Sequence, residues 1–239
     1  MKTSNKLFVA AVALVLGSMA TYDAALLAEY RTGHYKDPLH NFTKQVGTGF
    51  DAVEVPAGLY FRVKIEAGPA GVWVNKEATE YVRLRQHGRT LAVTLTSPEE
   101  VHFLGGQPHV IIHCPQLQQL TTDAGYLAVT RKDYRNDPSS EVLVRNFNQD
   151  SLRVNQRRAG TVTLESNNLR RLRAVAEAPA GSTAILVVEG TNNIQAADLA
   201  IEHQSKLALK TRIPQLRYHF SDSATVTFGG AAAQGLGLK

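Results

Sequence analysis

Apolar and polar residues alternate over short stretches through most of the chain, which predicts β-strands with one buried and one exposed face. The clearest region runs from Glu141 to Phe228, where such stretches recur roughly every ten residues between Asn, Asp, Gly, Ser and Pro. Similar stretches begin at Phe50, and Val110 to Cys114 forms a continuous apolar run between two prolines, so we expect both of its faces to be covered. The pattern therefore predicts an all-β domain.

The same region is weakly similar to itself. Leu152–Val154 and Val162–Leu164 are echoed by Leu199–Ile201 and Leu207–Leu209, a shift of about 45 residues that is typical of stacked repeats. One such repeat cannot bury its apolar face alone, whereas a stack makes the core continuous. We expect inward-facing and outward-facing positions as follows: inward Leu152, Val162, Leu207 and Leu209; outward Arg153, Thr163 and Ala208. We expect Asn at the corners, at Asn168, Asn192 and Asn193, because Asn tolerates the left-handed conformation.

The N-terminus has a lysine-bearing start and a wholly apolar stretch at residues 7–16. The small residues Ser18 and Ala20 follow, so one interpretation is a signal peptide cleaved after Ala20. The apolar pattern continues past Asp23 to Ala28, about 20 residues in all, which is just long enough for an uncleaved anchor. We favour the anchor, with a cleaved periplasmic or secreted form as the alternative; either way, the rest of the chain lies outside the cytoplasm. The residues expected in the membrane are Leu7, Phe8, Val9, Val12, Leu14, Val15 and Leu16.

Composition agrees with a globular domain behind this helix. Hydrophobic residues make up 44% of the chain and charged residues 20%, which excludes a disordered chain. Cys114 is the single cysteine, so an intramolecular disulfide and a cysteine-rich zinc site are excluded. The expected organisation is a signal peptide or anchor helix at 1–30, a linker at 31–49, the β domain at 50–229 and a flexible tail at 230–239.

The net charge is +5, and most basic residues alternate with apolar ones in the expected strands. The simplest interpretation is a solvated outer face. The alternative is an anion-binding face for acidic glycans or lipid headgroups; nucleic acid is the least expected ligand because the N-terminus indicates export. The basic residues concerned are Arg62, Lys64, Arg83, Arg85, Arg153, Arg157, Arg158, Arg170, Arg171, Arg173 and Arg217.

Candidate metal chemistry is confined to His102, His109, His113 and Cys114. On a strand, His109 and His113 lie about 13 Å apart and His113 and Cys114 face opposite ways, so we expect no shared metal ion. Cys114 is expected to be a buried thiol rather than a nucleophile.

Candidate acid–base chemistry has two sources. Carboxylates on neighbouring strands could act on a polysaccharide, with Arg131, Lys132 and Arg145 nearby in sequence; these carboxylates are Asp123, Asp133, Asp137, Glu141 and Asp150. Polar loops on rigid scaffolds often carry function, so we also single out a tentative ligand-contact loop: Arg131, Lys132, Asp133, Tyr134 and Arg135. Neither source has the pattern of a known nucleophile or phosphate-binding motif, and we assign no catalytic, cofactor-binding or metal-binding residue.

Residues 45 to about 229 resemble the putative auto-transporter adhesin, head GIN domain family of the Bacteroidetes. The stretches that carry the resemblance are Phe50–Val55, Phe61–Ile65, Val72–Val74, Val82–Leu84, Leu91–Leu95, Pro115–Leu120 and Ser221–Thr227. The resemblance implies a right-handed parallel β-helix or β-solenoid at the cell envelope and implies no catalytic residues.

The sequence therefore predicts a membrane-tethered, extracytoplasmic β-solenoid that acts as a binding, adhesin-like or structural module, not as an enzyme and without a cofactor. The expected partners are the membrane, through the N-terminal helix, and a glycan or another envelope protein; nucleic acid is not expected. One alternative is a polysaccharide-active enzyme on a β-helix scaffold, which carboxylates clustered in one groove would favour. Another is a β-sandwich that binds a ligand, which antiparallel sheets would favour.

Overall fold

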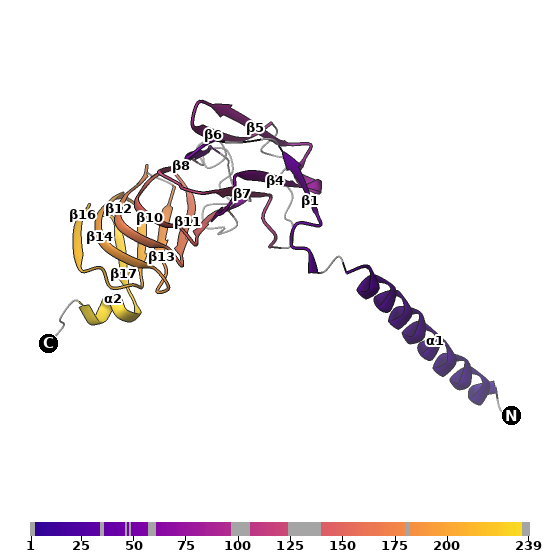
Figure 1. Ribbon diagram of the computed structural model, residues 1–239. Helices are drawn as coiled ribbons and strands as arrows, with labels where there is room; N and C mark the ends of the chain where they lie inside the picture. Colours follow the sequence, from indigo (N-terminus) through magenta and orange to yellow (C-terminus); the bar gives the residue numbers. More distant parts are fainter. Residues whose placement is uncertain are drawn as a thin grey trace. The chain divides into compact units, whose positions relative to one another are not determined.

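The computed structural model describes residues 3–33, 36–45, 47, 49–56, 61–96, 106–123, 140–179 and 182–235. The chain divides into two compact units, Met1–Phe42 and Thr43–Lys239, and each is described by itself. The first consists mainly of one helix, and the second holds nearly all of the strands (Figure 1).

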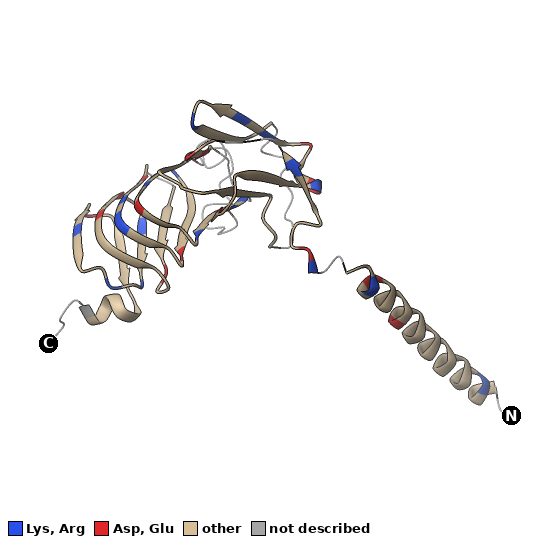
Figure 2. Ribbon diagram, in the orientation of Figure 1, with Lys and Arg blue, Asp and Glu red and all other residues tan. Residues whose placement is uncertain are grey.

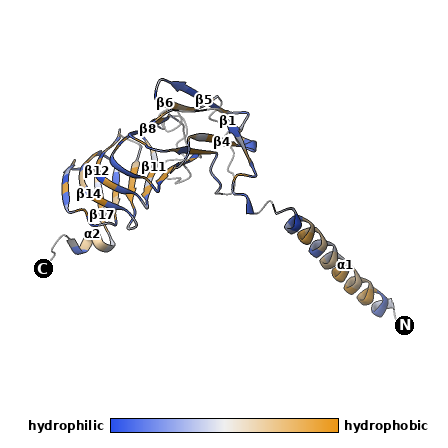
Figure 3. Ribbon diagram, in the orientation of Figure 1, coloured by the Kyte–Doolittle hydropathy of each residue, from blue (hydrophilic) through white to orange (hydrophobic). Residues whose placement is uncertain are grey.

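Helix α1 (Thr3–Thr32) has no buried residue. Its 30 residues extend about 45 Å. Polar side chains within the apolar stretch bond to the helix backbone: the Ser18 hydroxyl donates to Val15 O at 2.8 Å and the Thr21 hydroxyl to Gly17 O at 2.9 Å. By length and composition, α1 can cross a membrane, although a signal sequence meets the same criterion. Figure 3 shows the apolar character along most of the helix.

Two sheets form the second unit. In spatial order, the nine-stranded sheet contains β1 (Phe42–Gln45), β4 (Gly71–Asn75), β7 (Val110–Cys114), β3 (Arg62–Ala67), β9 (Glu141–Arg145), β11 (Gly160–Glu165), β13 (Ala184–Val188), β15 (Lys206–Leu209) and β17 (Thr225–Phe228). The eight-stranded sheet contains β16 (Gln215–Phe220), β14 (Asn193–His203), β12 (Asn168–Ala178), β10 (Asn148–Arg157), β8 (Gln119–Asp123), β2 (Ala52–Val55), β6 (Thr90–Leu95) and β5 (Val82–His87). The short helices are η2 (Lys76–Ala78) and α2 (Gly230–Gly235).

The prediction of a right-handed parallel β-helix is wrong. The structure has two mixed sheets rather than a closed solenoid: β4 pairs antiparallel with β7 and β5 antiparallel with β6. From β8 onward, consecutive strands alternate between the two sheets and their sheet neighbours are parallel. The physical reason for the error is that alternation of apolar and polar residues is the same in parallel and antiparallel strands, so it does not specify pairing.

The turn between β5 and β6 explains why these two strands pair antiparallel. Only Gly88 and Arg89 separate these strands, and Gly88 has a φ of 58°. A two-residue loop that begins with a left-handed glycine matches the right-handed twist of an antiparallel pair. The local turn therefore forces an antiparallel edge onto this sheet.

The predicted inward positions are confirmed. Leu152, Val162, Leu207 and Leu209 are each at most 2% exposed and belong to the core formed by both sheets. Their outward neighbour Arg153 is exposed. Figure 3 shows hydrophilic and hydrophobic segments alternating along the strands.

Replacing Leu152 by alanine should therefore lower the free energy of unfolding by about 2–5 kcal/mol, because the truncation leaves a cavity in a packed core. Arg153→Ala is the matched control, and its effect should stay within about 0.5 kcal/mol because the side chain is exposed. Urea titration followed by circular dichroism measures both values. Equal effects of the two substitutions would contradict the assigned faces.

Three neighbouring strands share a break in their alternation. In β12, Leu169 and Leu172 are both buried, so Arg170 and Arg171 lie consecutively on the exposed side. The pairing of β10, β12 and β14 passes over one residue in each strand at this level: Asp150, Arg170 and Gln195. Because each of the three strands passes over one residue, none has an extra residue relative to its neighbours, and the register is the same on both sides of the break. After the break, Arg171 and Arg173 face outward together.

The predicted corner role of Asn is partly corrected. Asn168, Asn192 and Asn193 do not have a positive φ, whereas Asn146 and Ser166 do, at 65° and 55°. Asn192 is 5% exposed and its side-chain amide donates to Leu164 O at 2.7 Å. Asn192 therefore stabilises the connection between β13 and β14 through its side-chain hydrogen bonds and not through a left-handed backbone conformation.

Candidate functional site

A groove of about 610 Å³ crosses the exposed face of the eight-stranded sheet. Its lining comes from β2, β8, β10, β12, β14 and β16 and the residues just before β2 and β8. These six strands are consecutive in the sheet, so the groove extends about 24 Å across them at 4.8 Å per step. Four arginines line it, namely Arg153, Arg171, Arg173 and Arg217. Figure 2 shows basic segments on these strands.

Strand register places the arginines in rows. Arg153 on β10 pairs with Arg173 on β12, which pairs with Asp198 on β14, which pairs with Arg217 on β16. Neighbours in such a row are about 4.8 Å apart at the backbone. Arg171 lies two residues before Arg173, on the same face and about 7 Å along the strand. The side chains of Arg153, Arg171 and Arg173 therefore start from one small area.

The electrostatics of the groove are dominated by unpaired cations. Among the described residues, the four groove arginines have no ion pair or hydrogen bond through their side chains. By contrast, two arginines outside the groove are paired: Arg158 with Asp123 at 3.1 Å and Arg145 with Glu66 at 3.1 Å. Within the part of the chain that the structure describes, the groove therefore has more basic than acidic side chains, with four arginines against Asp51 and Asp198.

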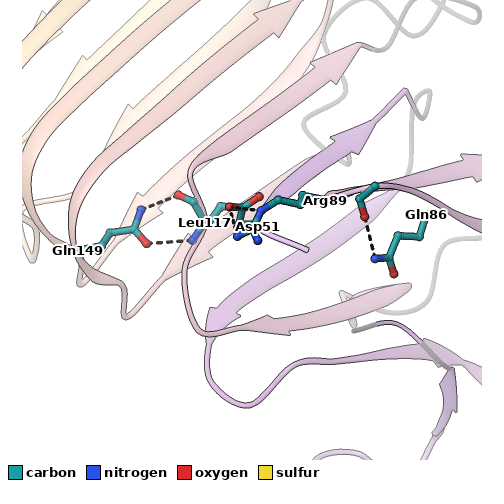
Figure 4. Close-up of polar contacts among 6 residues, drawn as sticks. Asp51, Gln86, Arg89, Leu117 and Gln149 are labelled. Carbon is teal, nitrogen blue, oxygen red and sulfur yellow. Dashed lines mark hydrogen bonds and ion pairs between the residues drawn. The ribbon is translucent and has the colours of Figure 1, made fainter. Parts of the chain in front are cut away.

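Two carboxylates also line the groove, Asp51 and Asp198, and they differ in whether a described side chain already binds them. Asp51 is 7% exposed and accepts two hydrogen bonds from the guanidinium of Arg89, at 3.0 Å from Nε and 2.6 Å from Nη2 (Figure 4). This hydrogen bond and the charge of Asp51 raise the pKa of Arg89 above its usual value. Asp198 has no partner among the described side chains. It is therefore the groove carboxylate that is not already engaged by a described side chain.

The β2–β8 end of the groove is held by backbone contacts. Asp51 O accepts the N–H of Gln118 at 2.7 Å. The side-chain amide of Gln149 forms two hydrogen bonds with the backbone of Leu117. The Gln149 Oε1 accepts the Leu117 N–H at 2.9 Å, and the Gln149 Nε2 donates to Leu117 O at 2.5 Å. Figure 4 shows the two bonds between Gln149 and Leu117, together with the bond from the Gln86 side chain within the β5–β6 hairpin. These bonds fix the loop that carries Gln118 and Gln119 to the neighbouring strands, so this end of the groove is preformed.

The three predicted carboxylates that the structure describes, Asp123, Glu141 and Asp150, do not converge. Glu141 lies on the nine-stranded sheet and accepts a hydrogen bond from Thr163 at 2.8 Å. Asp150 forms an exposed pair with Arg170 at 3.3 Å. Asp123 is aligned with Arg157, about 20 Å along β10 from Asp150. The remaining residues predicted by sequence lie outside the described part of the chain: Asp133, Asp137 and the whole loop Arg131, Lys132, Asp133, Tyr134 and Arg135.

The histidines and the cysteine occupy separate packing sites. His109 is 1% exposed and its Nδ1 accepts the Arg62 N–H at 3.1 Å, while His113 packs on Trp73 and lies 3.4 Å from Glu66. Burial, with a smaller contribution from the charge of Asp51, raises the pKa of Cys114 to about 12, which suppresses the reactive thiolate. Within the described ranges, no three His, Cys, Asp or Glu residues are grouped to hold a metal ion; His102 lies outside them.

The predicted membrane residues all lie on α1, and their exposed fractions range from 41% to 73%. They are Leu7, Phe8, Val9, Val12, Leu14, Val15 and Leu16. An apolar surface of this size, unburied by the protein, is typical of a segment with another apolar environment.

Sequence reasoning identified the groove arginines individually but interpreted them mainly as a solvated face. The feature of the sequence that could have indicated a shared basic site is the pair of consecutive arginines, Arg170 and Arg171, between Leu169 and Leu172. The alignment of Arg153 with Arg173 and of Asp198 with Arg217 follows only from strand register.

No protein-family model matches the chain, and no curated protein matches it. A solved structure described as a putative adhesin from Bacteroides fragilis is similar over 78% of this chain and 95% of its own, with 10% identity and a TM-score of 0.44. Another putative adhesin, from Parabacteroides distasonis, is similar over 79% of this chain and 93% of its own, with 11% identity and a TM-score of 0.45. A putative lipid binding protein from Parabacteroides distasonis covers 80% and 94%, with 10% identity and a TM-score of 0.26. Likeness at this level establishes neither family nor ligand for this chain.

Proposed function

We propose that the protein is a binding module of the cell envelope, tethered to a membrane by α1, whose β domain acts outside the cytoplasm without catalysis. Residues 1–30 are the anchor, 31–49 connect it to the β domain at 50–229, and 230–239 form the tail. Membership of the head GIN domain family is part of this proposal and is supported by the sequence stretches that resemble it.

The observation that carries the binding role is the groove on the eight-stranded sheet. It is open to solvent, it crosses six strands, and its four arginines lack protein partners among the described residues. Guanidinium groups without internal partners are available to anionic groups of a ligand, to which they bind through charge-assisted hydrogen bonds. A groove of this kind supports recognition, since charge complementarity selects and orients a partner.

The tether is supported by α1. Between Lys6 and Glu29 the helix carries a single charged residue, Asp23, and its polar hydroxyls bond to the helix backbone. Backbone and hydroxyl groups must be satisfied internally in a bilayer, so the helix fits that environment. Tethering also holds the β domain close to other envelope components, which raises their effective concentration at the groove.

Fractionation of cells that produce the full chain tests this proposal. The chain should sediment with membranes, resist extraction by alkaline carbonate and be degraded by protease added to spheroplasts. Its intact mass should include residues 1–20, whereas a mass that begins at Thr21 would replace the anchor by a cleaved signal peptide. Recovery of the chain as a protease-protected cytosolic protein would refute export and tethering together.

A further inference from the structure

Resting on the proposed binding role, we infer that the groove binds a linear acidic polysaccharide at two anion subsites. The first subsite consists of Arg153, Arg171 and Arg173, and the second is Arg217. Asp198, which lies between the two subsites, opposes binding and selects the spacing of the anionic groups.

The first subsite follows from strand geometry. Arg153 and Arg173 are register partners on adjacent strands, and Arg171 precedes Arg173 on the same face. All three are exposed and line the groove. Three guanidinium groups that start within about 8 Å of one another can converge on one carboxylate or sulfate. Leaving them so close without a ligand costs repulsion, which an anion relieves.

The second subsite is set apart by Asp198. Arg217 lies two strands from Arg173, about 10 Å away at the backbone, and Asp198 occupies the strand between them. Asp198 repels an anionic group placed halfway, so two anionic groups about 10 Å apart fit better than an unbroken run of charge. The groove therefore favours a polymer whose acidic groups are spaced along its length.

The remaining lining favours a sugar chain over other polyanions. Ser151, Gln118 and Gln215 contribute hydroxyl and amide groups to the lining beside the arginines, and these suit the hydroxyl groups of sugars. Among the residues that the structure describes, the lining contains no aromatic side chain, whereas proteins that bind single-stranded nucleic acid stack bases on aromatic rings. It also lacks a continuous apolar wall for an acyl chain, and a groove of about 24 Å exceeds what a single headgroup needs.

The test uses the full-length protein in nanodiscs of phosphatidylcholine, with an oligomer of alternating glucuronate and N-acetylglucosamine as the probe, because its carboxylates lie on every second sugar. Isothermal titration calorimetry should detect binding to the acidic oligomer, and raising the salt concentration should weaken it because exposed charges are screened. The fully methyl-esterified oligomer has the same backbone without the charge, and it should not bind detectably. Equal binding of both oligomers would overturn the inference.

Variants separate the groove from general surface charge. Arg171→Ala should weaken binding about tenfold, as expected for loss of a charge-assisted contact. The matched control is Arg170→Ala, which removes the preceding exposed arginine, whose partner is Asp150; its affinity should be unchanged. Asp198→Asn should tighten binding by about two- to fivefold, since it removes the opposing charge. Loss of affinity in Asp198→Asn, or equal losses for Arg170→Ala and Arg171→Ala, would overturn the assignment. Native circular dichroism of each variant confirms that it is folded.

Two competition experiments test whether the groove instead binds a free anion or an anionic lipid. Inorganic phosphate should compete only weakly, because it fills one subsite; full competition at comparable concentration would indicate a site for single anions and would refute a polymer site. Vesicles with phosphatidylglycerol should not displace the oligomer; displacement that depends on Arg171 would assign the groove to lipid instead. If no probe binds while the chain remains in membranes and open to external protease, the polysaccharide inference falls and the tether stands.

Discussion

Replacing Asn167 by alanine should lower the free energy of unfolding by about 3–6 kcal/mol, because the substitution leaves several buried polar groups without partners. Asn167 is 2% exposed. Its Oδ1 accepts the Phe147 N–H at 3.0 Å, and its Nδ2 donates to Val144 O and to Asn192 Oδ1, both at 3.0 Å. Alanine can replace none of these bonds.

The loss would extend beyond one corner of the chain. Asn192 Oδ1 also accepts the backbone N–H of Asn167 at 3.0 Å, and its amide donates to Leu164 O and Glu189 O. The Thr211 hydroxyl then donates to Asn192 O at 2.8 Å. This buried network ties successive connections between the two sheets, and such a network is strong only while every member is satisfied.

Asn168→Ala is the matched control, since it replaces the next residue along the chain. Its side chain is exposed, and among the described residues it bonds to Asn148 and Asn193, whose amides can bond to water instead. The expected loss is below about 1 kcal/mol. Urea unfolding of both variants measures the difference; a cost for Asn167→Ala no larger than that for Asn168→Ala would show that the buried network contributes little.

The alternation pattern was sufficient to identify strands and their buried faces, but not their pairing. Val162 and Leu164 are buried as the pattern predicts, because alternation follows directly from the pleat. The partner of each strand depends on contacts distant in sequence, and a parallel neighbour is not distinguished from an antiparallel one by polarity. Gly88 was the exception, since a left-handed glycine in a two-residue turn specifies an antiparallel pair locally.

The groove, like the strand pairing, could not be predicted from the pattern of a single strand. Arg153 and Arg173 look like solvated residues in sequence, because each alternates with buried neighbours. Their common function, as we propose it, depends on the register of β10 with β12, which is the same on both sides of the break in alternation after Leu169. A single strand therefore does not reveal the site. The loop at 131–135 remains a prediction, because it lies outside the described residues.

Introducing arginine at both Val12 and Val15 should move the full-length chain out of the membrane fraction. Both side chains are exposed on α1, at 41% and 54%, and both lie in the middle of the apolar stretch. Each arginine near the centre of a spanning helix costs about 2.5–3.5 kcal/mol on insertion scales, so the pair costs about 5–7 kcal/mol. The long side chains can reach the interface only in part from this depth.

The measurement is the share of the chain that resists alkaline carbonate extraction, together with its accessibility to protease in spheroplasts. Val12→Leu with Val15→Leu is the matched control, because it changes the same positions without adding charge, and it should leave both readouts as in the wild type. The double arginine variant should instead accumulate as a protease-protected cytosolic protein, since a helix that fails to insert also fails to start export. If the variant resisted carbonate extraction as fully as the wild type, contacts other than the bilayer interior would hold the chain to membranes. The arginine groove would then be the first surface to test for that attachment.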